Sequence, residues 1–228
     1  MVANGNGEAA PVRVLSWSER TEPASIYPEG IDGAVADLLG EAGGFEVRVS
    51  TIDDADQGLA EADLAWAEVL VYFSHVRHRE VSGETVARIL HHVQQRGMGF
   101  LPLHSSLDSK PFQELLDRPG RLPGWREDEK PSRVWVVQKD HPIAAGLGDG
   151  FVIPAEEMYQ EPFNIPPPDE LVFVSSFAGG EVFRSGCCWY RGAGRVFYFQ
   201  PGHETYPVYF QAEVRRAVAN GVRWCSGR

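Results

Sequence analysis

Residues 68–75 read EVLVYFSH, an almost uninterrupted apolar run that ends in a serine and a histidine. A strand that is apolar on every side is expected in the middle of a parallel sheet, where helices cover both faces. Ligands bind to such sheets beyond the carboxyl ends of the strands. This stretch therefore predicts an α/β fold and places His75 at the edge where a ligand would bind.

The segments on either side of this run alternate between strand and helix patterns. Strands are predicted at 12–17, 45–50 and 99–103. Helices are predicted at 30–42, at 59–67, behind an N-cap at Ser82, and from Ser109 onward. Short links between alternating elements indicate a parallel sheet with helices on both sides.

The second half of the chain has a different pattern, with several strands in succession. Strands are predicted at 133–138, 171–177, 187–190 and 195–200, with a hairpin turn at 192–194 and a closing helix at 213–225. We expect one domain over residues 11–228, preceded by a disordered tail at residues 1–10.

Composition restricts the partners and the compartment. The formal net charge is -11, which disfavours nucleic acid and anionic membranes. The three cysteines have no CxxC spacing, and no signal peptide or membrane-spanning run is visible, so we expect a cytoplasmic protein. Neither a phosphate-binding GxxxxGK loop nor a GxGxxG motif is present, so no nucleotide cofactor is expected.

Histidines follow three of the predicted strands. His75 ends the central strand, His104 follows 99–103, and His203 follows the last strand. Each could act as a general base, a hydrogen-bonding group or a metal ligand, and each could instead be a purely structural histidine. His78 lies three residues after His75, a spacing that places both rings on one face of a helical turn and suits a divalent metal.

A second candidate region is the acidic segment AEEMYQEPF, residues 155–163. Glu156, Glu157 and Glu161 surround Tyr159 and could supply a base or metal ligands. Composition alone favours the simpler interpretation, a solvated acidic loop. No GxSxG or GxCxG nucleophile motif occurs, and Cys187 and Cys188 fall inside a predicted strand as core residues.

Several segments together resemble the ThuA family of trehalose-utilisation proteins. They are YPEGIDGAVADLL (27–39), HVRHREVS (75–82), LHSSLDSK (103–110), EEMYQEPFNIPPPDELVF (156–173), GGEVFRSGCCWYRGAGRVFYFQPGHETYP (179–207) and ANGVRW (219–224). The resemblance implies a flavodoxin-like three-layer sandwich of the class I glutamine amidotransferase-like type, with a mostly parallel sheet and a C-terminal β-hairpin. His104 corresponds to the nucleophilic cysteine of amidotransferases, so glutaminase activity is not expected.

The resemblance also implies a site for a small carbohydrate. Its implied catalytic residues are His104, His203, Glu157 and Tyr159. From their places beside predicted strand ends and in the acidic segment, we also expect substrate contacts from Trp17, Glu19, Ser105, Glu161, Glu204 and Tyr206. A divalent zinc or manganese ion could be held by His75, His78, Glu157 and His203. Where family members often have Gly-His after the His-Ser pair, this chain has Ser106-Leu107.

We expect acid/base chemistry on a disaccharide or keto-disaccharide, of the isomerase, lyase or hydrolase type. An oxidoreductase of the same pathway is the expected protein partner, and a homo-oligomer is expected. The alternative is a non-catalytic carbohydrate-binding or accessory protein on an amidotransferase-like scaffold.

Overall fold

The central apolar run forms β3 (Val69–Phe73) in the computed structural model, which describes residues 10–228. All five of its side chains are buried, as predicted. It pairs in parallel with β1 (Val12–Ser18) on one side and β4 (Gly99–Leu103) on the other. β2 (Phe45–Thr51) extends the sheet beyond β1, and β11 (Gly194–Phe199) extends it beyond β4, both in parallel.

The remaining strands continue the same sheet in antiparallel fashion. In order from β11 they are β10 (Val182–Arg191), β9 (Glu170–Phe177), β6 (Ser132–Val136) and β7 (Gly150–Ile153). β10 and β11 form the predicted hairpin, with Arg191 opposite Gly194. β7 was not predicted, nor was the separate two-stranded sheet of β5 (Trp125–Arg126) and β8 (Met158–Tyr159).

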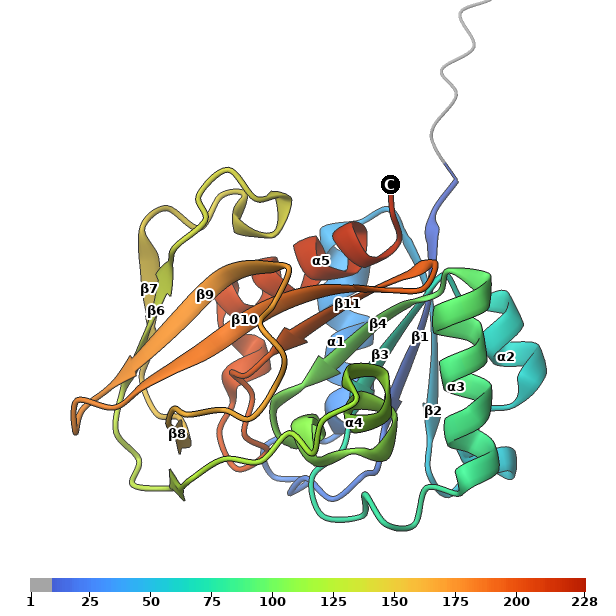
Figure 1. Cartoon of the computed structure of the whole chain (residues 1–228), viewed down its shortest axis with the longest axis horizontal. Helices are drawn as coiled ribbons and strands as arrows, with labels where there is room; N and C mark the ends of the chain where they lie inside the picture. The colour runs from blue at the N-terminus through green and yellow to red at the C-terminus, as the bar shows by residue number, and fades with distance from the viewer. Residues whose placement is uncertain (1–9) are drawn as a thin grey trace, which may run out of the picture.

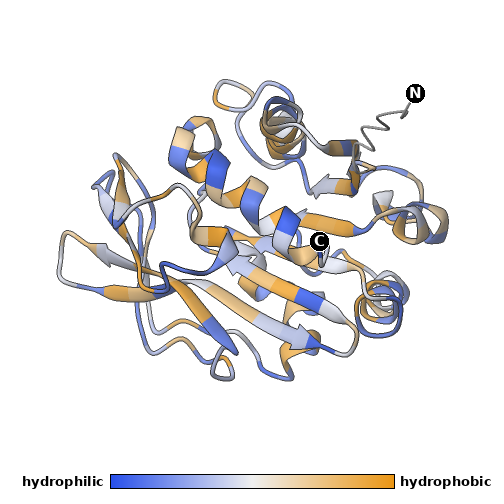
Figure 2. Cartoon of the chain, turned by 90° about the horizontal axis from the view of Figure 1, so that it is seen from above, coloured by the Kyte–Doolittle hydropathy of each residue, from blue (hydrophilic) through white to orange (hydrophobic). Residues whose placement is uncertain are grey.

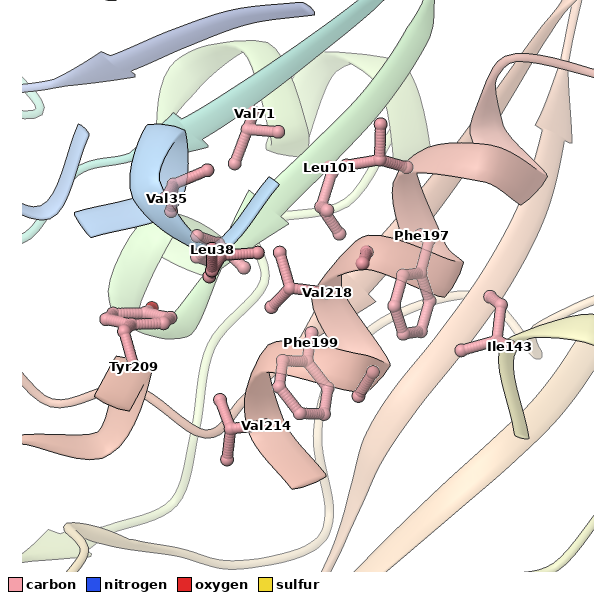
Figure 3. Close-up of a cluster of buried hydrophobic side chains, with 14 of the residues drawn as sticks. Val35, Leu38, Val71, Leu101, Ile143, Phe197, Phe199, Tyr209, Val214 and Val218 are labelled. Carbon is pink, nitrogen blue, oxygen red and sulfur yellow. The ribbon is translucent and has the colours of Figure 1, made fainter. Parts of the chain in front are cut away.

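Two helices cover one face of the sheet. α1 (Gly30–Ala42) and α5 (Ala212–Cys225) pack side by side on it, and their apolar stripes meet strand side chains in a shared core (Figures 1 and 3). The predicted inward positions of α5, among them Val214 and Val218, are fully buried. This face carries much of the aromatic and aliphatic core, including Phe197 and Phe199.

Three helices cover the opposite face of the parallel half. They are α2 (Glu61–Trp66), α3 (Gly83–Arg96) and α4 (Lys110–Leu116). The hydroxyl of Ser82 accepts a hydrogen bond from the Thr85 amide, which confirms the predicted N-cap. In Figure 2 orange, hydrophobic segments lie on several strands of the sheet, and the helices alternate between hydrophobic and hydrophilic positions.

The result is the α/β sandwich that the sequence predicts. Short 3-10 helices complete it at Ala55–Gly58, His104–Asp108, Pro142–Ala144 and Val208–Phe210. Within residues 10–228, none of the helices has the length and apolar character needed to cross a lipid bilayer. The predicted tail lies outside the described residues, apart from position 10.

Candidate active site

Three histidines from distant parts of the chain meet at one edge of the sheet. β3, β4 and β11 are consecutive in the sheet and parallel, so their carboxyl ends are neighbours. The ring centroids of His75 and His104 are 6.2 Å apart, those of His75 and His203 5.4 Å, and those of His104 and His203 5.2 Å. The structure thus brings the three strand-end histidines together.

His104 lies at the sharp turn from β4 into the 3-10 helix His104–Asp108. Its φ is +49°, in the left-handed region that side chains other than glycine rarely adopt. Such strain is common at functional sites. The correspondence of His104 to the amidotransferase nucleophile stays a prediction; the structure shows a sharp strand-to-helix turn at this position.

The ring of His104 is fully enclosed, and both of its nitrogens are engaged. Nδ1 is 2.8 Å from the Gln200 carbonyl oxygen, which can only accept, so Nδ1 carries a proton. Nε2 is 3.0 Å from Oε2 of Glu157 and 3.2 Å from the Tyr159 hydroxyl. Burial lowers the pKa of His104, but the hydrogen bond and charge of Glu157 outweigh it and raise the pKa to about 9.

The predicted role of His104 as a base stays a prediction. In this structure its side chain does not reach the surface, and both ring nitrogens are engaged in hydrogen bonds. We interpret His104 as a residue that positions Glu157.

The acidic segment around Tyr159 is not a solvated loop, which corrects the simpler interpretation. Glu156 is completely buried, and its carboxylate accepts hydrogen bonds from the backbone amides of Glu157, Gly202 and His203, at 2.9, 2.9 and 3.3 Å. Burial raises the pKa of Glu156 to about 7, against the charge of His104 and these amides. Glu156 therefore joins the segment before β8 (Met158–Tyr159) to the loop after β11.

Glu157 lies between the buried histidine and a cavity. Burial raises the pKa of Glu157, but the hydrogen bond and charge of His104 outweigh it, so the net pKa is below the ordinary value. Its Oε2 is also 3.7 Å from Nε2 of His203. The carboxylate is thus ionised and shared between two imidazoles.

The cavity has a volume of about 310 Å³ and a mostly polar wall. The predicted site residues on its wall are His75, Ser105, Glu157, Tyr159, His203 and Glu204. Sequence reasoning missed the others, which are Leu107, Asp108, Leu122, Trp125, Glu127 and Thr205. Trp125 belongs to β5 (Trp125–Arg126), which pairs with β8 so that Trp125 lies opposite Tyr159.

His75 and Glu204 are in contact on the cavity wall. Nε2 of His75 is 3.0 Å from Oε1 of Glu204. The Ser105 hydroxyl donates to the Ser74 carbonyl at 3.0 Å, so it accepts from Nδ1 of His75 at 2.7 Å. Burial raises the pKa of Glu204, but the hydrogen bond and charge of His75 outweigh it and lower the pKa to about 2.

His203 is held by a chain of hydrogen bonds on its outer side. Its Nδ1 is 2.8 Å from the Thr205 hydroxyl, which donates to Glu127 at 2.7 Å. Burial lowers the pKa of His203, and the charge of His104 lowers it further. Tyr206 was predicted to contact substrate. Its ring packs against the His203 ring, with the two centroids 5.5 Å apart, and it is not on the cavity wall.

Two predicted substrate contacts have structural roles instead. Trp17 is 1% exposed, stacks on Tyr72 at 4.3 Å and donates its indole N–H to the Gln57 carbonyl, so it belongs to the core. Glu19 is also buried, and its carboxylate accepts from the backbone amides of Val76 and Arg77. These hydrogen bonds hold the loop after β3 against the end of β1, because Glu19 directly follows that strand.

Glu161 and His78 also lie away from the cavity. Glu161, in the loop before β9, accepts two hydrogen bonds of 2.8 and 3.0 Å from the guanidinium of Arg184 on β10, which satisfies its charge. Nδ1 of His78 is 2.6 Å from the Ser74 hydroxyl, and its ring lines a different cavity, beside Lys110. The four residues predicted to bind a metal therefore do not form one donor group, because His78 lies at another cavity and His75 is grouped with His104 and Glu204, apart from Glu157 and His203.

Within the described residues, two groups of side chains bring three potential metal ligands within 4.8 Å of one another. One is His104, Glu157 and His203; the other is His75, His104 and Glu204. Ser106 and Leu107 stand where family members often have Gly-His. The Ser106 hydroxyl accepts a hydrogen bond from the Ser74 amide at 2.8 Å, and Leu107 contributes an apolar side chain to the cavity wall. No ligand atom stands where the family often has a histidine.

The fold and the site together define the class of protein. It is an α/β sandwich with a cavity, lined by histidines and carboxylates, at the carboxyl ends of its parallel strands. The turn after β4 carries His104 and no cysteine. The sequence of residues 13–225 matches the family described as trehalose utilisation, ThuA. The chain belongs to the ThuA family, as the sequence predicted.

Solved structures support the same fold. A putative ThuA-like protein from Parabacteroides merdae is 16% identical with a TM-score of 0.74, over 95% of this chain and 90% of that one. A second, from Bacteroides uniformis, is 16% identical with a TM-score of 0.66, over 98% and 95%. A putative GMP synthase component from Thermoplasma acidophilum is 12% identical with a TM-score of 0.56, over 96% of both chains, which is consistent with the amidotransferase-like fold. No curated protein matches the sequence.

Proposed function

We propose that this protein is an enzyme of sugar catabolism that carries out acid/base chemistry on a disaccharide or keto-disaccharide. Membership of the trehalose-utilisation family supports a sugar substrate. The cavity, at about 310 Å³, is at the lower end of the range of ligand sites, and its wall is rich in groups that hydrogen-bond hydroxyls.

The observation that carries the proposal is that two imidazole–carboxylate pairs face the same cavity. They are His75 with Glu204, at 3.0 Å, and His203 with Glu157, at 3.7 Å. A pair of this kind can take up or release a proton close to a bound substrate. Two pairs allow one to act as base while the other acts as acid.

A keto-disaccharide suits this arrangement because its carbonyl acidifies the neighbouring C–H bond. One pair removes that proton, and the electrons of the C–H bond form an enolate. When the enolate collapses, the glycosidic C–O bond breaks and the other pair protonates the departing oxygen. If the bond is retained, return of the proton to a different atom gives isomerisation.

Glutamine hydrolysis has no nucleophile in this site. His104 occupies the turn, while Cys187, Cys188 and Cys225 are buried in the core, where burial raises the pKa of each thiol. We propose a cytoplasmic protein acting after an oxidoreductase that forms the keto group, and we expect a homo-oligomer.

The test is turnover of 3-keto-trehalose compared with trehalose, followed by chromatography of the products. We expect turnover of the keto-sugar, reduced about 100-fold or more in His75→Gln and Glu204→Gln, the loss typical of a missing acid/base group. His91→Gln is the matched control, because His91 is exposed on α3.

Failure to turn over either sugar, with or without added Zn²⁺ or Mn²⁺, would refute the proposed reaction. If neither sugar is turned over but calorimetry shows that unmodified trehalose binds, the protein is instead an accessory carbohydrate-binding protein.

A further inference from the structure

The structure assigns a divalent-metal site to His104 Nε2, Glu157 Oε2 and His203 Nε2, with its open side toward the cavity. These donor atoms come from the end of β4, the segment before β8 and the loop after β11, and all lie within 4.8 Å of one another. All three residues are buried. Ion binding is independent of the proposed reaction; only the use of the ion in that reaction rests on it.

The spacing of the donors suits a small ion. Ligand bonds to Zn²⁺ of about 2.0–2.2 Å in a tetrahedral arrangement place neighbouring donors about 3.4 Å apart. Oε2 of Glu157 is 3.0 Å from Nε2 of His104 and 3.7 Å from Nε2 of His203. Small movements of the side chains would bring both distances to the required value.

The outer nitrogen of each histidine has the partner that a metal-binding imidazole requires. His104 donates from Nδ1 to the Gln200 carbonyl, which directs the Nε2 lone pair inward once a metal replaces the proton there. His203 can donate from Nδ1 to the Thr205 hydroxyl, which in turn donates to Glu127. The Thr205 backbone N–H also donates to Nδ1, at 3.2 Å, which favours a ring proton on Nε2 while no metal is bound. Metal binding through Nε2 therefore requires the proton to move to Nδ1, where the Thr205 hydroxyl can accept it because that hydroxyl donates to Glu127.

The donor set also has the composition of a catalytic site. Two histidines and one carboxylate with an open position are typical of catalytic zinc and of related sites for other divalent metals. The alternative group, His75, His104 and Glu204, would need the same Nε2 of His104, since Nδ1 is already bonded. Placing the ion with Glu157 and His203 would leave His75 and Glu204 as the proton-transfer pair, and the ion would then replace the second pair of the proposed reaction. A bound ion would polarise the keto oxygen of the substrate.

The test is elemental analysis of the full chain, purified without added metal and without chelator. It is followed by calorimetric titration of chelator-treated protein with Zn²⁺ and with Mn²⁺, in the absence of sugar. We expect about one ion per chain and binding of at least one of the two metals. His203→Gln should weaken that binding more than about 100-fold. Thr205→Val should weaken it about 10- to 100-fold, the usual cost of losing an outer partner.

His78→Gln is the matched control, because His78 lies outside the donor group, and it should bind metal like the parent protein. His104→Gln should also lose the metal, and circular dichroism will show whether this variant folds. If it does not fold, His203→Gln still decides the test, because His203 lies on the cavity wall. Absence of metal from the purified protein together with no binding of Zn²⁺ or Mn²⁺ would overturn the proposal. So would full metal binding by His203→Gln.

Discussion

Replacing Glu156 by glutamine tests whether this buried carboxylate holds the site together. One of its oxygens accepts from the amides of Glu157 and His203, and the other accepts from the amide of Gly202. Glutamine has nearly the same shape, but its amide NH₂ group must face at least one of these donors. One backbone N–H then loses its acceptor in a fully buried place.

The magnitude follows from these bonds. A buried donor left without an acceptor costs about 1–3 kcal/mol. The two remaining bonds lose the assistance of the carboxylate charge, but the burial that raises the pKa of Glu156 to about 7 shows that the charge itself is disfavoured there, so these two effects offset each other. The expected loss in the free energy of unfolding is therefore about 1–3 kcal/mol, which for a chain of this length lowers Tm by about 2–12 °C.

The assay is urea unfolding followed by tryptophan fluorescence, with the slope m checked for a change in the two-state transition. Glu46→Gln is the control, because Glu46 is exposed on β2 and should change stability by less than about 0.5 kcal/mol. Since the loop that carries His203 is released, Zn²⁺ or Mn²⁺ binding should weaken as well. Equal stability of the two variants would refute the view that Glu156 clamps the loop.

Two further substitutions test other parts of the site. Gly202→Ala should cost about 2–5 kcal/mol, because φ is +139° and the new Cβ would lie 2.0 Å from the Tyr209 hydroxyl oxygen. Gly180→Ala, with φ +92° and open space, should cost only about 1–2 kcal/mol, and equal urea midpoints for the two variants would contradict the clash. Trp125→Ala, which removes a 65% exposed ring from the cavity wall, should raise the KM for the sugar about 3- to 10-fold at unchanged stability. An unchanged KM would exclude Trp125 as a sugar contact.

Local signals in the sequence determined most of the fold. The period of apolar residues identified the strands of the parallel half and the helices between them, and Ser82 marked the start of α3. These signals depend only on residues that are close together in the sequence. The pairing of β5 with β8 depends on residues far apart, Trp125 and Tyr159, and neither two-residue strand has a pattern of its own.

The sequence placed His75, His104 and His203 each at the end of a predicted strand. That these ends are neighbours was decided by the sheet order, in which β11 lies beside β4. Which side chains reach the cavity was decided only by tertiary structure. Glu156 is a buried clamp because its partners lie 46 and 47 residues further along the chain. Glu19 instead binds the loop after β3. Burial and hydrogen-bond partners of a polar side chain are set by what packs over it, and that information is not local to the sequence.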